Sequence, residues 1–165
     1  GVGRLVIVDF DTVSRENLDR QFFFLDPIGM PQVDALAANL ARIDPAVRVQ
    51  AVNARIEASA VRQIFSGCDA VVEALDDAET KALFIEAVLS SMPSLPLVAG
   101  SGIAGWGASD DIRVRRMGSF VLVGDQCREV GQHHAPHAPR VCAVAAIQAN
   151  EVLALLLGPM DAEEA

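Results

Sequence analysis

Asp9 ends the apolar run LVIV and is the first side chain in the sequence whose position suggests chemistry. A short apolar run that stops at an acid is typical of a buried parallel strand. In doubly wound nucleotide-binding folds, an acid at that place accepts hydrogen bonds from ribose hydroxyls. The alternative is that Asp9 only begins a turn, and its position alone leaves both interpretations open.

Arg20 follows Asp9 in a segment that is otherwise acidic. A guanidinium group can bind phosphate oxygens through two parallel hydrogen bonds. The competing interpretation is a surface arginine that pairs with Asp19 or Asp26. Taken alone, Arg20 is better explained by such a surface pair.

Asp76 and Asp77 follow a further apolar run, residues 70–75, which we predict to be a strand. Carboxylates at the C-terminal end of a parallel strand face the ligand crevice. Mg²⁺ is often held by one or two carboxylates together with nucleotide phosphates. A helix N-cap is the alternative role, and the helix dipole also favours an acid there. Both roles are compatible if Asp76 binds the metal and Asp77 caps the helix.

Cys127 is a candidate thiol in a loop that also contains His133, His134 and His137. An exposed thiol can act as a nucleophile or carry a persulfide, although an inert surface cysteine is the simpler interpretation. Metal binding needs converging side chains and a fourth ligand, whereas prolines make the histidine segment turn-like. We therefore expect an exposed loop. The three cysteines form no CxxC pair, so no zinc site is predicted.

The segment GSGIAG at residues 100–105 matches the G-x-G-x-x-G pattern of dinucleotide-binding loops. That motif needs a helix to open at its end, because the helix N-terminus binds the phosphate. The residues that follow, WGASDD, are typical of a loop. We predict a tight glycine-rich bend here in place of a nucleotide loop.

The composition fits one globular domain of 165 residues, with 52% hydrophobic and 21% charged residues. The net charge of −9 repels phosphate backbones, so nucleic-acid binding is not expected as a main activity. An odd number of cysteines and the lack of a visible signal peptide indicate a reducing cytoplasm. Residues 141–157 are apolar but include Gln148, Asn150 and Glu151, which favours a buried helix over a membrane span.

The elements that must position these residues alternate along the chain. We expect strands at residues 5–9, 47–52, 70–75 and 96–99, and helices at 33–43, 58–65 and 77–89. This alternation predicts a doubly wound α/β fold with a mostly parallel sheet. Two further strands, 112–116 and 120–124, are expected to pair antiparallel on the C-terminal side of the chain.

The first expected strand begins almost at Gly1, and no glycine-rich phosphate loop stands before Asp9. Such a loop normally lies about 20 residues upstream of the ribose-binding acid. We therefore expect an N-terminal strand and this loop to precede the sequence. On that expectation, residues 1–165 form a single, N-terminally truncated nucleotide-binding domain.

The order of these residues resembles the ThiF/MoeB family, which is similar to the ubiquitin-activating enzymes. The run DFDTVSRENLDRQ at residues 9–21 is its most specific part. Supporting segments are IGMP at 28–31, RIDP at 42–45, EALDD at 73–77 and Ala-Pro at 138–139. The resemblance therefore covers nearly the whole chain. The lack of CxxC pairs and the segment ETK at 79–81 look like the zinc-free branch of ThiF proteins.

The resemblance implies a Rossmann-like fold and the ATP-dependent adenylylation of a ubiquitin-like sulfur carrier such as ThiS, in thiamine biosynthesis. The carrier's C-terminal Gly-Gly carboxylate would be activated. It further implies that Asp9 binds ribose, that Asn17 and Arg20 contact the phosphates, and that Asp76, with Asp77 beside it, holds Mg²⁺. A homodimer is implied, with residues 100–107 and 124–139 bordering the carrier's tail.

Gln32 departs from the family, which usually has a lysine there that contacts the triphosphate. Glutamine can donate a hydrogen bond but brings no charge, and loss of such a contact costs on the order of 10²–10³ in rate. A non-catalytic module that binds a carrier or a twin subunit is therefore the alternative function. A nicotinamide or flavin oxidoreductase is supported only by analogy of fold, and it gives residues 17–21 no role.

Overall fold

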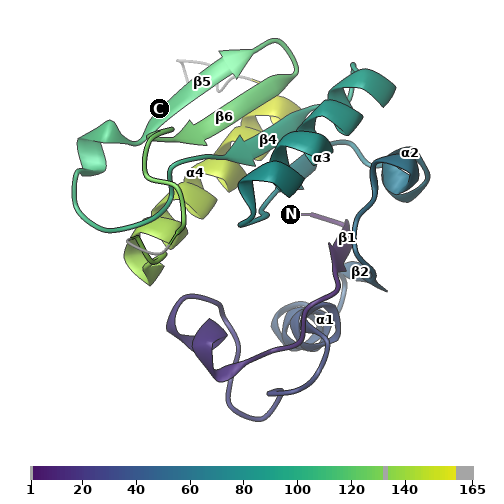
Figure 1. Ribbon diagram of the computed structural model, residues 1–165. Helices are drawn as coiled ribbons and strands as arrows, with labels where there is room; N and C mark the ends of the chain where they lie inside the picture. Colours follow the sequence, from purple (N-terminus) through teal and green to yellow (C-terminus); the bar gives the residue numbers. More distant parts are fainter. Residues whose placement is uncertain (1, 132–133, 159–165) are drawn as a thin grey trace, which may run out of the picture. The chain divides into compact units, whose positions relative to one another are not determined.

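The computed structural model describes residues 2–131 and 134–158 (Figure 1). The chain divides into two compact units, Gly1–Glu57 and Ala58–Ala165. We call them unit 1 and unit 2 and describe each by itself.

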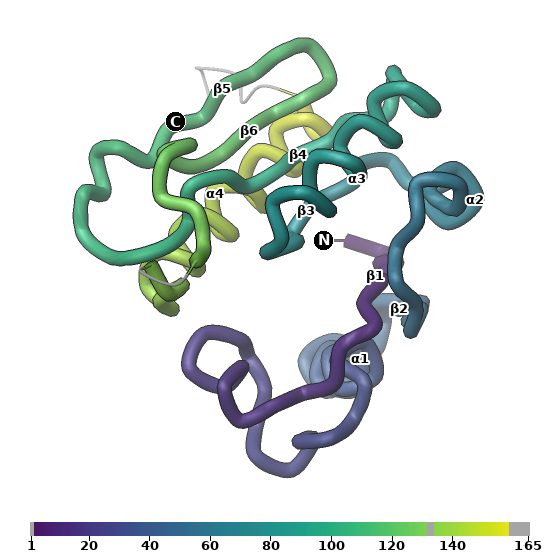
Figure 2. The backbone as a smooth tube through the Cα atoms, in the orientation of Figure 1, coloured from purple at the N-terminus to yellow at the C-terminus, as the bar shows by residue number. Residues whose placement is uncertain are grey.

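Unit 1 is a β-α-β element. Strand β1 (Arg4–Asp9) pairs in parallel with β2 (Arg48–Asn53), and Asp9 lies opposite Asn53 at the end of the pair. Helix α1 (Gln32–Ile43) connects the two strands and packs on both, because parallel strands need a crossover connection. A loop with the short 3₁₀ helix η1 (Arg15–Asp19) joins β1 to α1 and can be followed in purple in Figure 2.

The elements predicted for unit 1 are confirmed, with one difference in the core. Val33 and Ala35 on α1 are each 2% exposed, whereas the apolar Ile43, at the end of the helix predicted at residues 33–43, is 79% exposed. Ile43 is the last residue of the helix, since the chain turns extended at Asp44.

Unit 2 contains a four-stranded sheet in the order β3-β4-β6-β5. Its strands are β3 (Val71–Glu73), β4 (Leu97–Gly100), β5 (Arg113–Met117) and β6 (Phe120–Gly124). The strands β3, β4 and β6 are parallel, and β5 pairs antiparallel with β6. The predicted antiparallel pair is thus confirmed, and the chain has the predicted α/β, Rossmann-like fold with a mostly parallel arrangement of strands.

Helices lie on both faces of this sheet (Figure 1). Helix α3 (Ala78–Ser91) covers one face and α4 (Ala138–Leu157) covers the other. The shorter helices of the unit are η2 (Ala58–Ala60), α2 (Val61–Phe65) and η3 (Ser109–Asp111). The single helix predicted at residues 58–65 is therefore a 3₁₀ turn followed by a short α-helix.

Four valines form the core of unit 2 beneath α4. Val98, Val121, Val123 and Val144 form a cluster between the sheet and α4. On α3, Phe84 and Val88 are buried, whereas the neighbouring apolar Leu83 is 57% exposed. Residues four apart share one face of a helix, so the inward face of α3 runs through Phe84 and Val88.

Helix α4 is long enough, and with a mean hydropathy of 1.6 apolar enough, to cross a membrane by those criteria alone. Its buried side chains are nevertheless mostly polar: Arg140, Val144, Gln148 and Glu151. Their spacing places them on one face, and the three polar side chains all bond to other parts of unit 2. These bonds join one face of α4 to unit 2, but only 22% of its most apolar 18-residue stretch is buried, so the expected burial holds for that face alone.

Candidate functional site

The segment that carries the predicted nucleotide contacts folds back onto the start of α1. The N–H of Val13 donates to the carbonyl of Met30 at 2.8 Å, and the N–H of Gly29 donates to the carbonyl of Val13 at 2.8 Å. Gly29 has a φ of +91°, which glycine adopts without strain. The N–H of Gln32 donates to the Asp11 carbonyl at 2.9 Å, so the loop and the helix start are joined.

Asn17 and Gln32 meet at this junction. Asn17 Oδ1 accepts hydrogen bonds from the N–H of Ser14 at 2.8 Å and from Gln32 Nε2 at 3.1 Å. Gln32 is only 8% exposed, and its Nε2 also lies 3.5 Å from the Thr12 carbonyl oxygen. Within residues 2–131 and 134–158 the Nδ2 group of Asn17 has no partner, so it is a donor available to a phosphate.

Arg20 makes the surface pair that the sequence suggested. Its Nη1 donates to Asp19 Oδ1 at 2.9 Å and to the Glu16 carbonyl at 2.8 Å. The Asp19 side chain is 68% exposed, and such exposed pairs contribute only about 0–1 kcal/mol. As far as the structure describes the chain, these bonds use Nη1 alone, which leaves Nε and Nη2 for a phosphate.

Asp9 begins a turn, because its Oδ1 accepts the N–H of Asp11 at 2.9 Å. The second carboxylate oxygen accepts nothing from the described residues, so the turn does not compete with ribose binding. Unit 1 thus brings Asn17 into contact with Gln32 and places Arg20 at the end of η1, while Asp9 stays at the end of β1.

In unit 2, Asp77 caps α3 as predicted. Its Oδ2 accepts the N–H of Thr80 at 2.7 Å. Asp76 is exposed in the bend between β3 and α3. Among the described residues no three His, Cys, Asp or Glu side chains gather to hold a metal ion. One carboxylate with phosphates and water is a normal set of ligands for Mg²⁺, so Asp76 fits that role.

A buried ion pair stands directly before this bend. Glu73 is 1% exposed, and its Oε2 lies 3.0 Å from Lys81 Nζ. Lys81 Nζ also donates to the Gly100 carbonyl at 2.6 Å, and Glu73 Oε1 accepts the N–H of Leu75 at 2.5 Å. Burial raises the pKa of Glu73, while Lys81 and the N–H of Leu75 act in the opposite direction.

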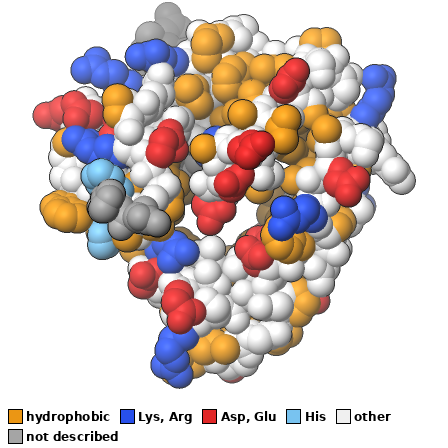
Figure 3. All heavy atoms as spheres, in the orientation of Figure 1, with side chains coloured by type: hydrophobic (Ala, Val, Ile, Leu, Met, Phe, Trp, Pro, Cys, Tyr) orange, Lys and Arg blue, Asp and Glu red, His pale blue; other side chains and the backbone are white. Residues whose placement is uncertain are grey.

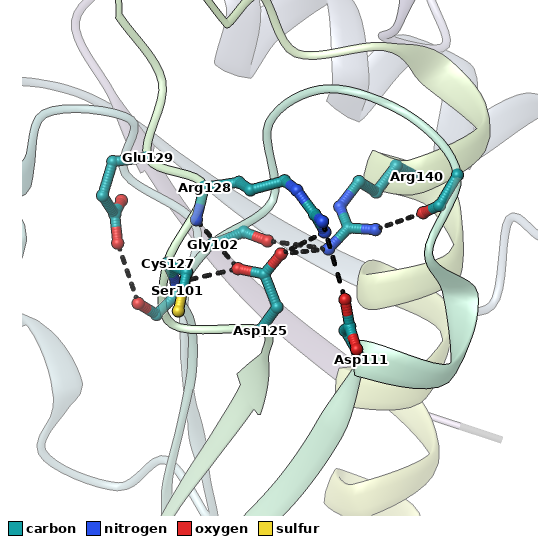
Figure 4. A network of polar contacts seen from close by, with 9 residues as sticks. Ser101, Gly102, Asp111, Asp125, Cys127, Arg128, Glu129 and Arg140 are labelled. Carbon is teal, nitrogen blue, oxygen red and sulfur yellow. Dashed lines mark hydrogen bonds and ion pairs between the residues drawn. The ribbon is translucent and has the colours of Figure 1, made fainter.

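A second buried ion pair joins two loops to α4 (Figure 4). Asp125 Oδ2 lies 2.6 Å from Arg140 Nη2 and 2.8 Å from Arg128 Nη1. Its Oδ1 accepts the N–H groups of Cys127 at 2.8 Å and Arg128 at 2.9 Å. Burial alone would raise the pKa of Asp125, but these N–H groups and the two guanidinium groups lower it below its ordinary value.

Arg140 extends this network to the glycine-rich bend. It is 4% exposed and donates to the carbonyls of Gly107 at 2.8 Å and Gly102 at 3.4 Å. A Cβ at Gly102 would overlap Asp125 Oδ1, and a Cβ at Gly124 would overlap the Ser101 carbonyl oxygen. The bend predicted at residues 100–105 is confirmed, because no helix opens directly after it.

Cys127 is free and exposed, and it lines a pocket of about 340 Å³. The other lining residues are Asp111, Arg113, Arg115, Gly124, Asp125, Gln126 and Arg128. His137 packs edge-on against Trp106, with ring centres 5.5 Å apart. His133 lies outside the described residues, whereas His134 and His137 are exposed, as expected for this loop. On the face shown in Figure 3, acidic and basic side chains are interspersed.

Sequence reasoning missed four buried charges: Glu73, Lys81, Asp125 and Arg140. Two of them carry a signal in the sequence. Glu73 interrupts an apolar run, and Arg140 stands in the first turn of a helix, where the helix dipole disfavours a cation. Both positions call for a partner of opposite charge elsewhere in the chain, which sequence alone does not identify.

Two curated relatives are similar over part of the chain. The SAMP-activating enzyme E1 of Haloferax volcanii is 38% identical over 61% of this chain and 37% of its own length. The molybdopterin-synthase adenylyltransferase of Salmonella typhimurium is 34% identical over 62% of this chain and 41% of its own length. The chain therefore spans less than half the length of these relatives.

Among solved structures, the tRNA N6-threonylcarbamoyladenosine dehydratase TcdA of E. coli, in complex with AMP, is similar in fold. Its TM-score is 0.79 at 18% identity, over 92% of this chain and 74% of that chain. At that identity the likeness concerns the fold alone. The family comparison covers the sequence from end to end: residues 1–165 match the ThiF family, and the chain belongs to it.

Proposed function

We propose that the protein containing this chain uses ATP to adenylylate the C-terminal carboxylate of a ubiquitin-like carrier protein. The observation that carries the proposal is membership of the ThiF family over residues 1–165. The names of the two curated relatives, an activating enzyme and an adenylyltransferase, agree with it. The open donors of Asn17 and Arg20 add support from the structure.

In this reaction a carboxylate oxygen of the carrier attacks the α-phosphorus of ATP. A new P–O bond forms, the bond to the bridging oxygen breaks, and pyrophosphate leaves with the electron pair. The chain needs no nucleophile of its own, because positioning and charge stabilisation are sufficient for such transfers.

Four of the predicted site residues have a part in this proposal. Asp9 accepts hydrogen bonds from the ribose hydroxyls, and Asn17 Nδ2 donates to the phosphates. Arg20 donates through Nε and Nη2 and stabilises the negative charge on the leaving pyrophosphate. Asp76 is the protein ligand of Mg²⁺, which when bound neutralises phosphate charge.

The finer assignment is to a ThiS-like carrier with a C-terminal Gly-Gly, in thiamine biosynthesis, by a cytoplasmic homodimer that needs no zinc. It rests on the resemblance of residues 9–21 and 73–81 to the zinc-free ThiF proteins. A MoaD-like or SAMP-like carrier is the competing substrate, suggested by the names of the relatives.

ATP–pyrophosphate exchange tests the proposal, with ThiS-like and MoaD-like carriers compared side by side. We expect exchange that depends on Mg²⁺ and on the carrier's terminal carboxylate. Arg20→Ala should lower it about 10²-fold, because a donor to a developing anion is lost. Arg15→Ala is the matched control, since Arg15 is an exposed arginine on the same 3₁₀ helix. No carrier-dependent exchange by the unaltered protein would contradict the proposal.

A non-catalytic carrier-binding module is the second candidate, and Gln32 is the observation that favours it. Gln32 is nearly buried and bonded to Asn17 without bringing a positive charge. A lysine at this position would keep a donor for Asn17 Oδ1 and add a charge for the triphosphate. If the unaltered protein binds a carrier without exchange and Gln32→Lys restores exchange, the protein is a weakened enzyme. If Gln32→Lys restores nothing, the module is non-catalytic.

A further inference from the structure

We propose that the buried Glu73–Lys81 pair is a positioning device that holds the bend at residues 74–77, so that the Asp76 carboxylate is set for a metal bound to nucleotide. The inference rests on the proposed function. It assigns Glu73 and Lys81 a part in the reaction without contact to substrate.

The pair sits where the structural elements of unit 2 converge. Glu73 is the last residue of β3, Lys81 belongs to α3, and Gly100 is the last residue of β4. Lys81 Nζ bridges the Glu73 carboxylate and the Gly100 carbonyl, at 3.0 and 2.6 Å. From α4, Gln148 Nε2 donates to the Glu73 carbonyl at 3.1 Å. Lys81 thereby fixes the Glu73 carboxylate, and Gln148 holds the backbone of the same residue.

The fixed carboxylate in turn holds the bend. Glu73 Oε1 accepts the N–H of Leu75, the residue just before Asp76. On the other side, Asp77 accepts the N–H of Thr80 and begins α3. Asp76 itself is exposed, and its position therefore depends on its two anchored neighbours. Residues that orient a metal ligand typically matter to binding nearly as much as the ligand itself.

Stability alone does not explain this pair. An apolar pair of similar volume is often as stable as a buried ion pair or more so, because both charges lose their hydration. Lys81 is also the only lysine in the sequence, beside twelve arginines. A compact ammonium group with three donors can bridge a carboxylate and a carbonyl that diverge. The hydrogen bond from Leu75 to Glu73 is a contact that an apolar pair would lose.

Three variants separate positioning from folding. The double variant Glu73→Leu/Lys81→Met removes both charges and the acceptor for Leu75. Glu73→Gln keeps an acceptor oxygen there. The matched control Arg116→Met/Glu151→Leu removes an ion pair between β5 and α4, whose Nη2 and Oε1 atoms lie 2.7 Å apart. Strand β5 is at the opposite edge of the sheet from β3, which leads into the bend. All are compared with the unaltered protein by amide hydrogen exchange at residues 74–77 and by titration with Mn²⁺·ATP and with metal-free ATP.

We expect the double variant to lose protection at Leu75 and to bind Mn²⁺·ATP about 10–100-fold more weakly, with metal-free ATP affinity unchanged. Glu73→Gln should stay close to the unaltered protein, and the control should change neither readout. Unchanged protection at Leu75, or equal losses with and without metal, overturns the inference alone. If the unaltered protein does not bind Mn²⁺·ATP, the proposed function is overturned together with this inference.

Discussion

Unit 2 contains two buried acid–base pairs whose carboxylates respond differently to burial. Glu73–Lys81 lies at the end of β3, and Asp125–Arg140 lies just after β6. Both carboxylates are almost fully buried, yet the pKa of Glu73 is raised and that of Asp125 is lowered. Burial raises the pKa in both cases, so the difference comes from their partners.

The partners differ in number and kind. Asp125 receives two backbone N–H groups and two guanidinium groups, which together outweigh desolvation. Glu73 has one ammonium group and the N–H of Leu75, and these donors do not outweigh the desolvation of its carboxylate. A buried carboxylate is held ionised by the number of donors that it collects. Asp125 therefore behaves as a permanent anchor for its loops, whereas Glu73 is ionised at a cost in stability.

The largest effect is expected for Asp125→Ala. It leaves Arg140 charged, 4% exposed and unpaired, and breaking a buried pair costs about 3–5 kcal/mol. Urea unfolding should show this loss, whereas Asp110→Ala, at an exposed acid near the same loops, should change stability by less than about 0.5 kcal/mol. An equal loss of stability in both variants would mean that the Asp125–Arg140 pair does not stabilise these loops.

Gly124→Ala tests the close backbone packing directly before Asp125. The added Cβ would overlap the Ser101 carbonyl oxygen, and the φ of +134° is strained for alanine. We expect a loss of about 3 kcal/mol, at the upper end of overpacking costs. Gly118→Ala is the control, because its φ of +64° is also positive but nothing lies within 4 Å. It should lose only about 1 kcal/mol, and a matching loss would show that crowding is not the cause.

Lys81→Met should lower the free energy of unfolding by less than Asp125→Ala does. The carboxyl of Glu73, whose pKa is already raised, can take up a proton when its partner is removed. We expect a loss of about 2 kcal/mol at neutral pH, smaller in mildly acidic buffer. A loss as large as that of Asp125→Ala, with no dependence on pH, would contradict the distinction between the two pairs.

The two carboxyls should affect the pH dependence of stability in opposite directions: the contribution of Glu73 falls as the pH rises, and that of Asp125 falls as the pH is lowered. A raised pKa means that the folded chain holds the proton of Glu73 more tightly than the unfolded chain does. The contribution of Glu73 is therefore full below its ordinary value of 4.5 and is lost as the pH rises through the raised pKa. The contribution of Asp125 is present above its ordinary value of 3.8 and is lost as the pH falls through the lowered pKa.

Two neutral variants measure these contributions. Relative to the unaltered protein, Glu73→Gln should gain stability as the pH rises above 4.5. The deficit of Asp125→Asn should shrink as the pH falls below 3.8. Urea unfolding across this pH range gives the free energy of unfolding of each variant. If both variants change with pH in the same direction relative to the unaltered protein, the distinction between the two carboxyls is wrong.

The strand and helix pattern was predictable because it depends on local periodicity. The cap at Asp77 and the bend at residues 100–105 were predictable for the same reason, since both follow from neighbours in sequence. The buried pairs were not, because Asp125 and Arg140 are distant in sequence and only the fold brings them together. Gln32 was expected to face the triphosphate, and its bond to Asn17 appears only once the loop folds back onto α1.

Formation of the carrier adenylate tests the central claim most directly. The protein is incubated with Mg²⁺, ATP and a ThiS-like carrier, and the carrier is analysed by intact-mass spectrometry. We predict that AMP appears on the C-terminal carboxylate of the carrier, that Arg20→Ala greatly reduces it, and that a carrier with an amidated C-terminus gains none. A carrier that binds but never gains AMP, with the unaltered protein and with Gln32→Lys, would contradict the account.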